Sequence, residues 1–140
     1  MRYLGIDYGS KRVGLALSDE NGTMGFPHAT FENTAMLAEE IAALIEKEKV
    51  GAVVIGESKD FAGNDNAIAK DSQLLGARLK ERTGLEVFFE DERLTSAAAR
   101  RQFDQTEKTR KPKSTANVDA SAAALILTSF LEKQHGQAPH

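Results

Sequence analysis

The first third of the chain alternates between hydrophobic and polar positions with the period of two that is typical of β-strands. Arg12–Ser18 alternate in this way, and Arg2–Asp7 form another short predicted strand that precedes them, with a tight turn in between. Another turn at residues 19–22 contains an Asn-Gly pair, which favours a hairpin, so a third strand is expected at about Met24–Phe31. The pattern therefore predicts an antiparallel meander of three strands.

The pattern then changes to hydrophobic residues three or four positions apart. This spacing predicts an amphipathic helix from about Thr34 to Lys49, with Asn33 or Thr34 as its N-cap. The apolar run Gly51–Gly56 that follows is typical of a parallel strand that is buried on both faces. The chain thus passes from a meander to a crossover connection.

The rest of the chain repeats this alternation of helix and strand. The expected elements are a second helix that ends at Thr83 with Gly84 as its C-cap, a strand at Leu85–Glu90, and helices at about Thr95–Phe103 and Thr115–Lys133. Three antiparallel strands followed by βα crossovers predict an α/β fold with a five-stranded mixed sheet and helices on both faces.

Length and composition indicate one globular unit. The 140 residues are 41% hydrophobic and 28% charged, which is ordinary for a folded domain. We expect a single domain at residues 1–133 and a flexible tail at 134–140. No stretch approaches the roughly 20 apolar residues needed to cross a bilayer, and no apolar signal segment opens the chain. We therefore expect a cytoplasmic protein without a membrane partner.

Asp7 stands where the first strand is expected to end, just before the turn that contains Gly9. The carboxyl edge of an α/β sheet is where ligands usually bind, so this carboxylate is a candidate for chemistry. The alternative is that Asp7 only caps the turn, which is a common role of aspartate. The residue alone favours neither interpretation.

Asp119 is more informative because of the face on which it lies. It shares a helical face with Ala122, Ala123, Ile126 and Phe130, the face that must pack on the sheet. An acid that only complements the helix dipole contributes about 0.3–1 kcal/mol and would face solvent. A buried carboxylate is costly unless it is paired or bound to metal, so we favour a functional role.

Further acids follow the two predicted parallel strands. Glu57 follows the first of them, and Glu90, Asp91 and Glu92 end or follow the second, although consecutive acids can also be a solvated loop. Several carboxylates in a chain with no cysteine and three histidines favour Mg²⁺ or Mn²⁺ over zinc. Two such ions about 4 Å apart can activate a water and stabilise the leaving oxygen of a phosphodiester.

Basic residues gather locally, although the net charge of −3 gives no overall attraction for nucleic acid. Four of them lie between the last two predicted helices, close in sequence to Asp119: Lys108, Arg110, Lys111 and Lys113. Arg12 and Arg93 are further candidates beside the acids. Such side chains supply sequence-independent affinity for phosphates. The alternative is a solvated linker.

Three ordered motifs resemble those of the YqgF/RuvX family. They are GIDYGSKRVGLA from Gly5 to Ala16, DERLTS from Asp91 to Ser96, and VDASAAALIL from Val118 to Leu127. The resemblance covers nearly the whole chain. It implies an RNase H-like fold and a divalent-metal-dependent nuclease, in which Asp7, Glu92 and Asp119 match the family's catalytic and metal-binding acids.

The resemblance also implies candidate substrates. The family is associated with maturation of the 5′ end of precursor 16S rRNA in ribosome biogenesis, and it is also described as a Holliday junction resolvase of DNA recombination. Structured RNA or branched DNA, and pre-ribosomal particles, are the implied partners. Glu57 stands where RuvC-type resolvases have a catalytic glutamate, so Glu57 and Asp91 are additional candidate acids.

Two other functions compete with the nuclease. The Asp-x-Gly turn also opens the ATP-binding domains of sugar kinases and actin-like ATPases, but these grip nucleotide between two domains. The chain has neither the length for a second domain nor a Gly-rich P-loop motif, so no nucleotide cofactor is expected. The third possibility is a catalytically inactive RNA-binding module of ribosome assembly, against which the presence of all three acids argues.

Overall fold

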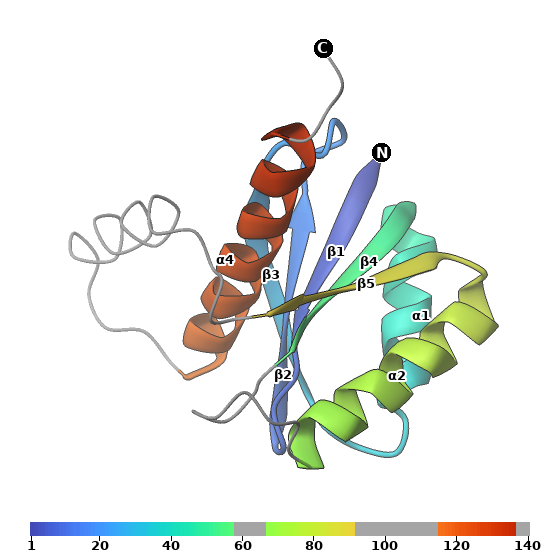
Figure 1. The fold of residues 1–140 in the computed structure, drawn as a ribbon. Coiled ribbons are helices and arrows are strands. Elements are labelled where there is room, and N and C mark those ends of the chain that lie inside the picture. The colour runs from blue at the N-terminus through green and yellow to red at the C-terminus, as the bar shows by residue number, and fades with distance from the viewer. Residues whose placement is uncertain (58–66, 92–114, 137–140) are drawn as a thin grey trace.

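A five-stranded sheet in the order β3-β2-β1-β4-β5 forms the centre of the molecule (Figure 1). The computed structural model describes residues 1–57, 67–91 and 115–136, with side chains at 1–56, 70–90 and 120–134. The strands are β1 (Arg2–Asp7), β2 (Arg12–Ser18), β3 (Gly25–Glu32), β4 (Val50–Glu57) and β5 (Glu86–Asp91). The helices are α1 (Leu37–Glu48), α2 (Ala67–Thr83) and α4 (Thr115–Gly136).

The pairing of the strands confirms the predicted mixed sheet. β1 pairs with β2, and β2 with β3, in antiparallel fashion, whereas β1 pairs with β4, and β4 with β5, in parallel. The edge strand β3 contains Pro27, which is tolerated there because an edge strand leaves part of its backbone without a ladder partner. The meander and the two crossovers are therefore as the pattern predicted.

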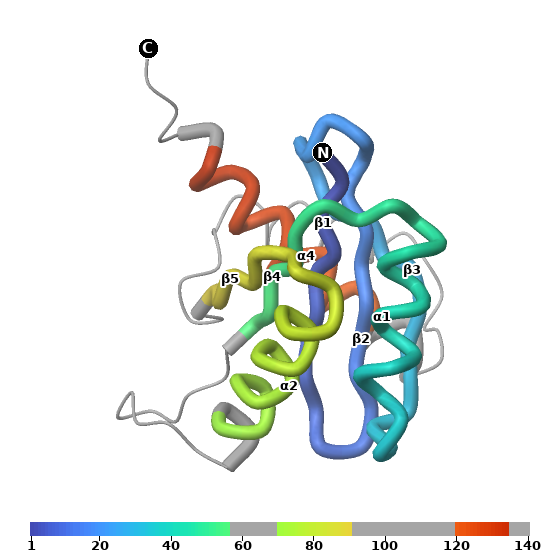
Figure 2. Tube along the Cα trace, turned by 90° about the vertical axis from the view of Figure 1, so that its right-hand side faces the viewer, coloured from blue at the N-terminus to red at the C-terminus, as the bar shows by residue number. Residues whose placement is uncertain are grey.

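Helices cover both faces of the sheet (Figures 1 and 2). On one face, α1 and α2 pack over Leu4, Ile6 and Ile55 in the larger hydrophobic cluster. On the other face, α4 packs over Ala16 and Val54 in a second cluster. Successive residues of a strand point to opposite faces, so each central strand supplies side chains to both clusters.

α4 approaches the sheet closely because glycine faces it. A Cβ atom built on Gly5 would lie 2.7 Å from the Cβ of Leu127 and 3.0 Å from the carbonyl oxygen of Ala123. A Cβ on Gly25 would lie 3.0 Å from the carbonyl oxygen of Ala124. The absence of side chains at these two positions lets the helix backbone settle against β1 and β3.

Several element boundaries differ from the prediction. α1 begins at Leu37, three residues after the expected Thr34, because the Thr34 hydroxyl accepts a hydrogen bond from the Met36 amide in a turn that precedes the helix. α2 ends at Thr83, followed by Gly84 with φ of 75°, as predicted. α4 continues to Gly136 and so includes the first residues of the expected tail.

Two expectations remain outside these observations. The helix predicted at Thr95–Phe103 and the last residues of the tail, 137–140, lie outside the described residues. Among the helices that are described, none combines the length and the apolar character needed to span a membrane.

Candidate active site

Asp7 is the last residue of β1, at the carboxyl edge of the sheet. Its Cα partners are Gly14 on β2 and Gly56 on β4, so glycine lies on both sides of it. The side chain is half-buried and lies on the same face as Gly5, the face that α4 covers. Asp7 thus presents a carboxylate at the end of a buried central strand, with little side-chain bulk beside it.

A tight turn follows Asp7, and hydrogen bonds from Asn33, which is distant in sequence, hold it in place. A Cβ atom on Gly9 would lie 2.5 Å from the carbonyl oxygen of Arg12, so only glycine fits there. The Asn33 side-chain amide donates to the Gly9 carbonyl oxygen at 2.8 Å, and the Asn33 backbone amide donates to that of Lys11 at 2.9 Å. Asn33, predicted as a helix cap, instead anchors the turn beside Asp7, a contact that local sequence does not signal.

The backbone of Asp119 lies in the second turn of α4, at the end of the helix nearest to Asp7. Phe130 packs against Tyr3, with ring centroids 6.1 Å apart, and Gly5 meets Leu127 and Ala123. α4 therefore runs antiparallel to β1. Two residues along a strand span about 6.6 Å, which is close to the length of about 6 Å that four residues span along a helix. This step leads from Gly5 to Asp7 on β1 and from Ala123 to Asp119 on α4.

The buried face predicted for this helix is confirmed where side chains are described. Ala123 and Ile126 are buried, and Phe130 packs against the same cluster. Position 119 is one turn before Ala123 on that face. The side chain of Asp119 itself lies outside the described part.

The structure describes the backbone of two of the other candidate acids and does not describe the third. Glu57 and Asp91 are the last residues of β4 and β5 and are Cα partners of each other, so their backbones end at the same edge as Asp7. Their side chains are not among those described. The remaining candidates lie wholly outside the described residues: Glu92, Arg93, Lys108, Arg110, Lys111 and Lys113. Arg12, the first residue of β2, is exposed at this edge.

The carboxylate of Glu90 is already paired with a lysine and is therefore not free to bind a metal ion. Glu90 is 5% exposed, and its carboxylate lies 2.5 Å from the ammonium group of Lys133 on α4. Glu90 is aligned with Gly56, and Gly56 with Asp7, so two strand spacings, about 10 Å, separate Glu90 from Asp7. Glu90 therefore joins the end of β5 to α4.

The donor chemistry of this edge suits a hard divalent cation. Asp7 provides carboxylate oxygens, and the backbones of Glu57, Asp91 and Asp119 end or pass at the same edge. The chain contains no cysteine, and oxygen ligands are those that Mg²⁺ and Mn²⁺ prefer. Within residues 1–56, 70–90 and 120–134, no three acids or histidines form a cluster that can hold an ion.

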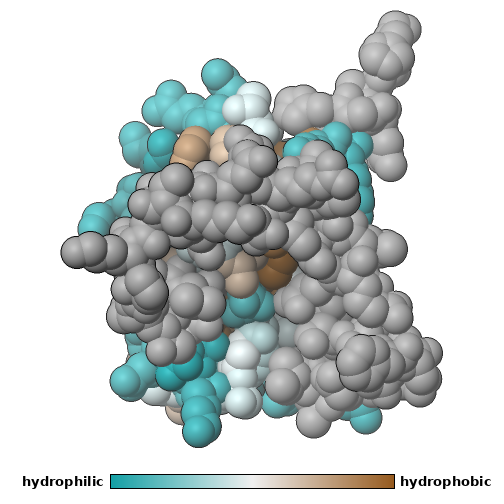
Figure 3. All heavy atoms as spheres, turned by 90° about the vertical axis from the view of Figure 1, so that its left-hand side faces the viewer, coloured by the Kyte–Doolittle hydropathy of each residue, from teal (hydrophilic) through white to brown (hydrophobic). Residues whose placement is uncertain are grey.

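Part of the surface on the α4 side is formed by described residues (Figure 3). Hydrophilic residues are visible at the margins of this face, and hydrophobic atoms are visible at its centre and towards its upper left. The hydrophobic residues of α4 that cluster with Ala16 and Val54 are buried against the sheet.

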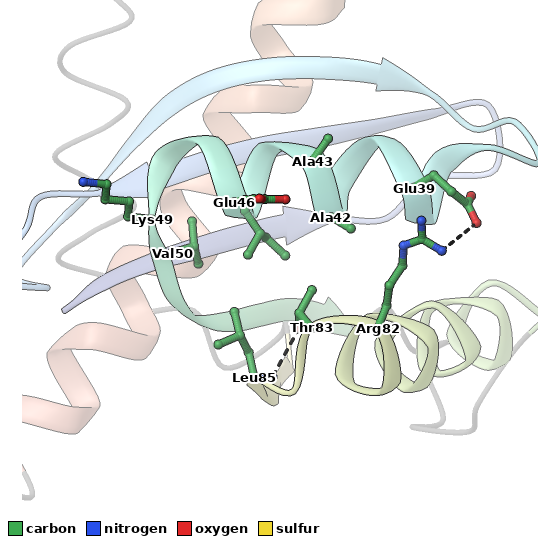
Figure 4. Close-up of a pocket in the computed structure, with 10 residues that line it drawn as sticks. Glu39, Ala42, Ala43, Glu46, Lys49, Val50, Arg82, Thr83 and Leu85 are labelled. Carbon is green, nitrogen blue, oxygen red and sulfur yellow. Dashed lines mark hydrogen bonds and ion pairs between the residues drawn. The ribbon is translucent and has the colours of Figure 1, made fainter.

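A second region of interest is a cavity at the opposite edge of the sheet (Figure 4). Its volume is about 520 Å³, and it lies between the ends of α1 and α2, near the amino ends of β4 and β5. Arg82 and Glu39 form an ion pair there at 3.5 Å. None of the predicted site residues lines it. A smaller cavity of about 160 Å³ lies beside Tyr8, next to Asp7.

Known proteins resemble the chain over nearly its whole length. The family described as "RuvX: Holliday junction resolvase" matches residues 1–133. A "Putative pre-16S rRNA nuclease" of Maridesulfovibrio salexigens is 36% identical, over 95% of this chain and 99% of that protein. A protein with the same description from Nitratidesulfovibrio vulgaris is 38% identical, over 94% and 93% of the two chains.

Solved structures share the fold at low sequence identity. RuvC of T. thermophilus in complex with a Holliday junction substrate superposes with a TM-score of 0.65 at 16% identity, covering 99% of this chain and 98% of that one. The fowlpox virus Holliday junction resolvase superposes with a TM-score of 0.58 at 17% identity, covering 95% and 99%. The architecture is therefore the RNase H-like fold of these resolvases.

Proposed function

Because the chain belongs to the RuvX family, we propose that it is a nuclease that hydrolyses phosphodiester bonds in the 5′-end maturation of precursor 16S rRNA. The observation that supports this proposal is the close approach of Gly5 on β1 to Leu127 and Ala123 on α4, because Asp7 follows Gly5 along the strand and Asp119 precedes Ala123 along the antiparallel helix. The relatives over 30% identical that cover nearly the whole chain are described as nucleases of this precursor.

We assign three acids to the reaction: Asp7, Glu92 and Asp119, with Glu57 and Asp91 as additional candidates. Asp7 is held by a central buried strand, and Asn33 fixes the turn that follows it. A rigid strand end supports precise placement of a reacting group better than a free loop does. In this proposal the carboxylates orient the attacking water and would hold the divalent ions that offset the negative charge of the phosphate, while the face that α4 covers limits access of bulk water.

The same acids would bind Mg²⁺ or Mn²⁺, and two ions are expected. The all-oxygen donor set and the absence of cysteine support these metals over zinc. A bound divalent ion supplies an activated water and stabilises charge on the leaving oxygen. The contribution of the chain is to place carboxylates from strands far apart in sequence at a single edge.

The test is cleavage of a labelled precursor 16S rRNA fragment with Mg²⁺ or Mn²⁺ and with EDTA. Asp7→Asn and Asp119→Asn keep the shape of each side chain but remove its charge. Because loss of an outer contact at a metal site already costs about 10–100-fold, we expect each variant to lower kcat by more than about 100-fold with an unchanged melting temperature. Glu81→Gln removes the same charge at an exposed position of α2 that lines neither of the two cavities, and is the matched control. Near-wild-type rates in both site variants would refute the assignment.

A second candidate substrate is a Holliday junction. The family description and the fold of the RuvC complex with a junction favour it. A four-way DNA junction and the precursor RNA, compared at equal concentration, separate the two by the ratio of kcat/KM. Faster cleavage of the junction would move the function to DNA recombination. Tight binding of both without cleavage under every metal condition would favour an inactive RNA-binding module.

A further inference from the structure

A cavity of about 160 Å³ lies at the same strand end as Asp7, but on the other face of the sheet. Tyr8 lines it and packs against the cluster under α1 and α2, whereas Asp7 lies on the side of α4. The other walls are the segment 33–38, which leads into α1, and residues 71–78 of α2. The cavity is therefore separate from the carboxylates but adjacent to them.

The polar groups of the cavity include both donors and acceptors. Asp71 and Arg78 line it from α2, are exposed, and have no hydrogen bond or ion pair within the described part of the chain. Asn33 uses its side-chain amide on Gly9, which leaves its carbonyl oxygen as an acceptor. A simple anion would be repelled by Asp71, and an apolar ligand would leave these groups unused. The set suits a ligand that carries donors and acceptors at its edge.

The size and the apolar walls suit one flat ring. Tyr8, Leu37, Ala38 and Leu75 supply aromatic and aliphatic surface. A cavity of about 150 Å³ accommodates a benzene molecule. Leu74, which also lines the cavity, is 61% exposed, so apolar surface at the rim remains uncovered in this chain. A flat ring with polar edges and two apolar faces is the description of a nucleobase.

We propose that this cavity binds the base of an unpaired nucleotide that flanks the phosphodiester cut at Asp7. The proposal rests on the proposed nuclease function for the identity of the polymer. Unpaired bases that stack on aromatic side chains and bond through their edges are the usual means of recognising single-stranded nucleic acid. Because Asp7 and Tyr8 are consecutive at the end of β1, a nucleic-acid strand that passes around this end of the sheet can reach both faces. The cavity then sets the distance between an unpaired base and the cut.

Binding can be tested without cleavage by titrating uridine monophosphate into the protein and following backbone amide signals by NMR. We expect saturable shifts at residues 33–38 and 71–78, and none at these positions with ribose phosphate, which lacks the base. Equal shifts with ribose phosphate would show a phosphate site instead and overturn the proposal. The absence of shifts up to about 10 mM would overturn it as well.

Matched variants separate the cavity from general effects on the surface. Ala35→Leu fills the cavity from an exposed position, and Ala43→Leu adds the same side chain at an exposed position of the opposite edge. We expect only Ala35→Leu to weaken nucleotide binding, by about 5-fold or more. Arg78→Gln and Lys80→Gln form a second pair, in which only Arg78 lines the cavity. Equal effects within each pair would contradict the assignment.

An RNA substrate with one base removed at each position in turn links the cavity to catalysis. We expect one abasic position beside the cut to raise KM by about 5- to 100-fold in the wild type, and to have little effect in Ala35→Leu. Cleavage that ignores every abasic position contradicts the cavity proposal while leaving the nuclease intact. Uridine monophosphate binding without cleavage of any polymer contradicts the nuclease function while leaving the cavity site intact.

Discussion

At the turn between β2 and β3, Asp19 accepts hydrogen bonds from both the side chain and the backbone of one residue. The Thr23 hydroxyl and the Thr23 amide each lie 2.7 Å from its carboxylate, and the Met24 amide lies 3.1 Å away. The Thr23 hydroxyl, followed by the two amides, lowers the pKa of Asp19 from 3.8 to about 2. The charged carboxylate is therefore favoured by folding.

This pKa gives a prediction about acid stability. A carboxyl whose pKa is lower in the folded state stabilises the fold above its unfolded pKa, and that stabilisation is lost as the pH falls through the folded pKa. We expect Asp19→Ala to lower the melting temperature at pH 7, and the difference from wild type to shrink between pH 3.8 and about 2. Thermal unfolding followed by circular dichroism measures this.

The control for this experiment is Asp71→Ala, because Asp71 is exposed and has no hydrogen bond within the described residues. Its melting temperature should stay close to that of the wild type at each pH. A difference between Asp19→Ala and wild type that does not change with pH would contradict the prediction.

Individual residues were predictable where their role is local. Asp7 could be placed at the end of a strand because the strand pattern and the turn that contains Gly9 lie next to each other in the sequence. The local pattern predicts Asn33 or Thr34 as a helix cap. Nothing near Asn33 in the sequence indicates that its side chain instead binds the carbonyl oxygen of Gly9. The pairing of Glu90 with Lys133 joins positions 43 residues apart and is equally invisible to a local pattern.

At the scale of elements, the contact between α4 and β1 decides where Asp119 lies. Gly5 has no side chain, and a Cβ there would meet Leu127 at 2.7 Å, closer than real Cβ atoms approach. The position of the helix relative to β1 thus depends on the absence of a side chain at Gly5. The helix itself was predictable from its apolar residues, but its distance from the sheet was not.

Gly5→Ala tests this dependence. Overpacking should destabilise the protein by about 1–3 kcal/mol and displace α4, so that cleavage falls along with stability. Leu127→Gly removes the Cβ and Cδ2 atoms that the new methyl group would meet at 2.7 and 3.3 Å, while the carbonyl oxygen of Ala123 at 3.0 Å remains. We expect the double variant to be more stable than the sum of the two single changes predicts, and to regain part of the activity. Urea unfolding and the cleavage rate measure the two effects.

Strict additivity of the two changes would contradict this account, because residues in contact should couple. Gly84→Ala is a less suitable control, since its φ of 75° adds backbone strain. Ala43→Gly, at an exposed helical position far from the contact, provides a better one, with the expected loss of about 1 kcal/mol from helix propensity.

For the whole molecule, the two edges of the sheet differ in character. The carboxyl edge holds Asp7 and the backbones of Glu57 and Asp91, whereas the amino edge holds the cavity around the Glu39–Arg82 ion pair. The mixed sheet that begins with three antiparallel strands, and the helices on both its faces, followed from the periodicity of the sequence. The larger cavity could not be predicted in this way, because the gap between two helices depends on how they pack.

The four basic residues between the last two predicted helices give a prediction at the scale of the whole molecule. Neutralising Lys108, Arg110, Lys111 and Lys113 together should weaken RNA binding on all sequences. It should also reduce the slope of log affinity against log salt by up to about 4, about one for each phosphate contact. Fluorescence anisotropy between low and physiological salt measures the slope.

A control with the same change in charge is available at the amino edge. Lys47, Lys49, Lys80 and Arg82 lie at the ends of α1 and α2, and neutralising these four should leave the salt slope close to that of the wild type. Equal slopes in both quadruple variants would mean that binding responds to net charge and that the segment around Lys111 is only a connector.

The ion pair between Glu90 and Lys133 has a consequence for how the site would fill with metal. This ion pair links the last turns of α4 to β5. The middle of the helix packs closely against β1 at Gly5. A helix secured at two points along its length has little room to slide or tilt. The backbone that carries Asp119 near its beginning would then be preorganised, so that ion capture would require little ordering of the chain and its entropic penalty would stay small.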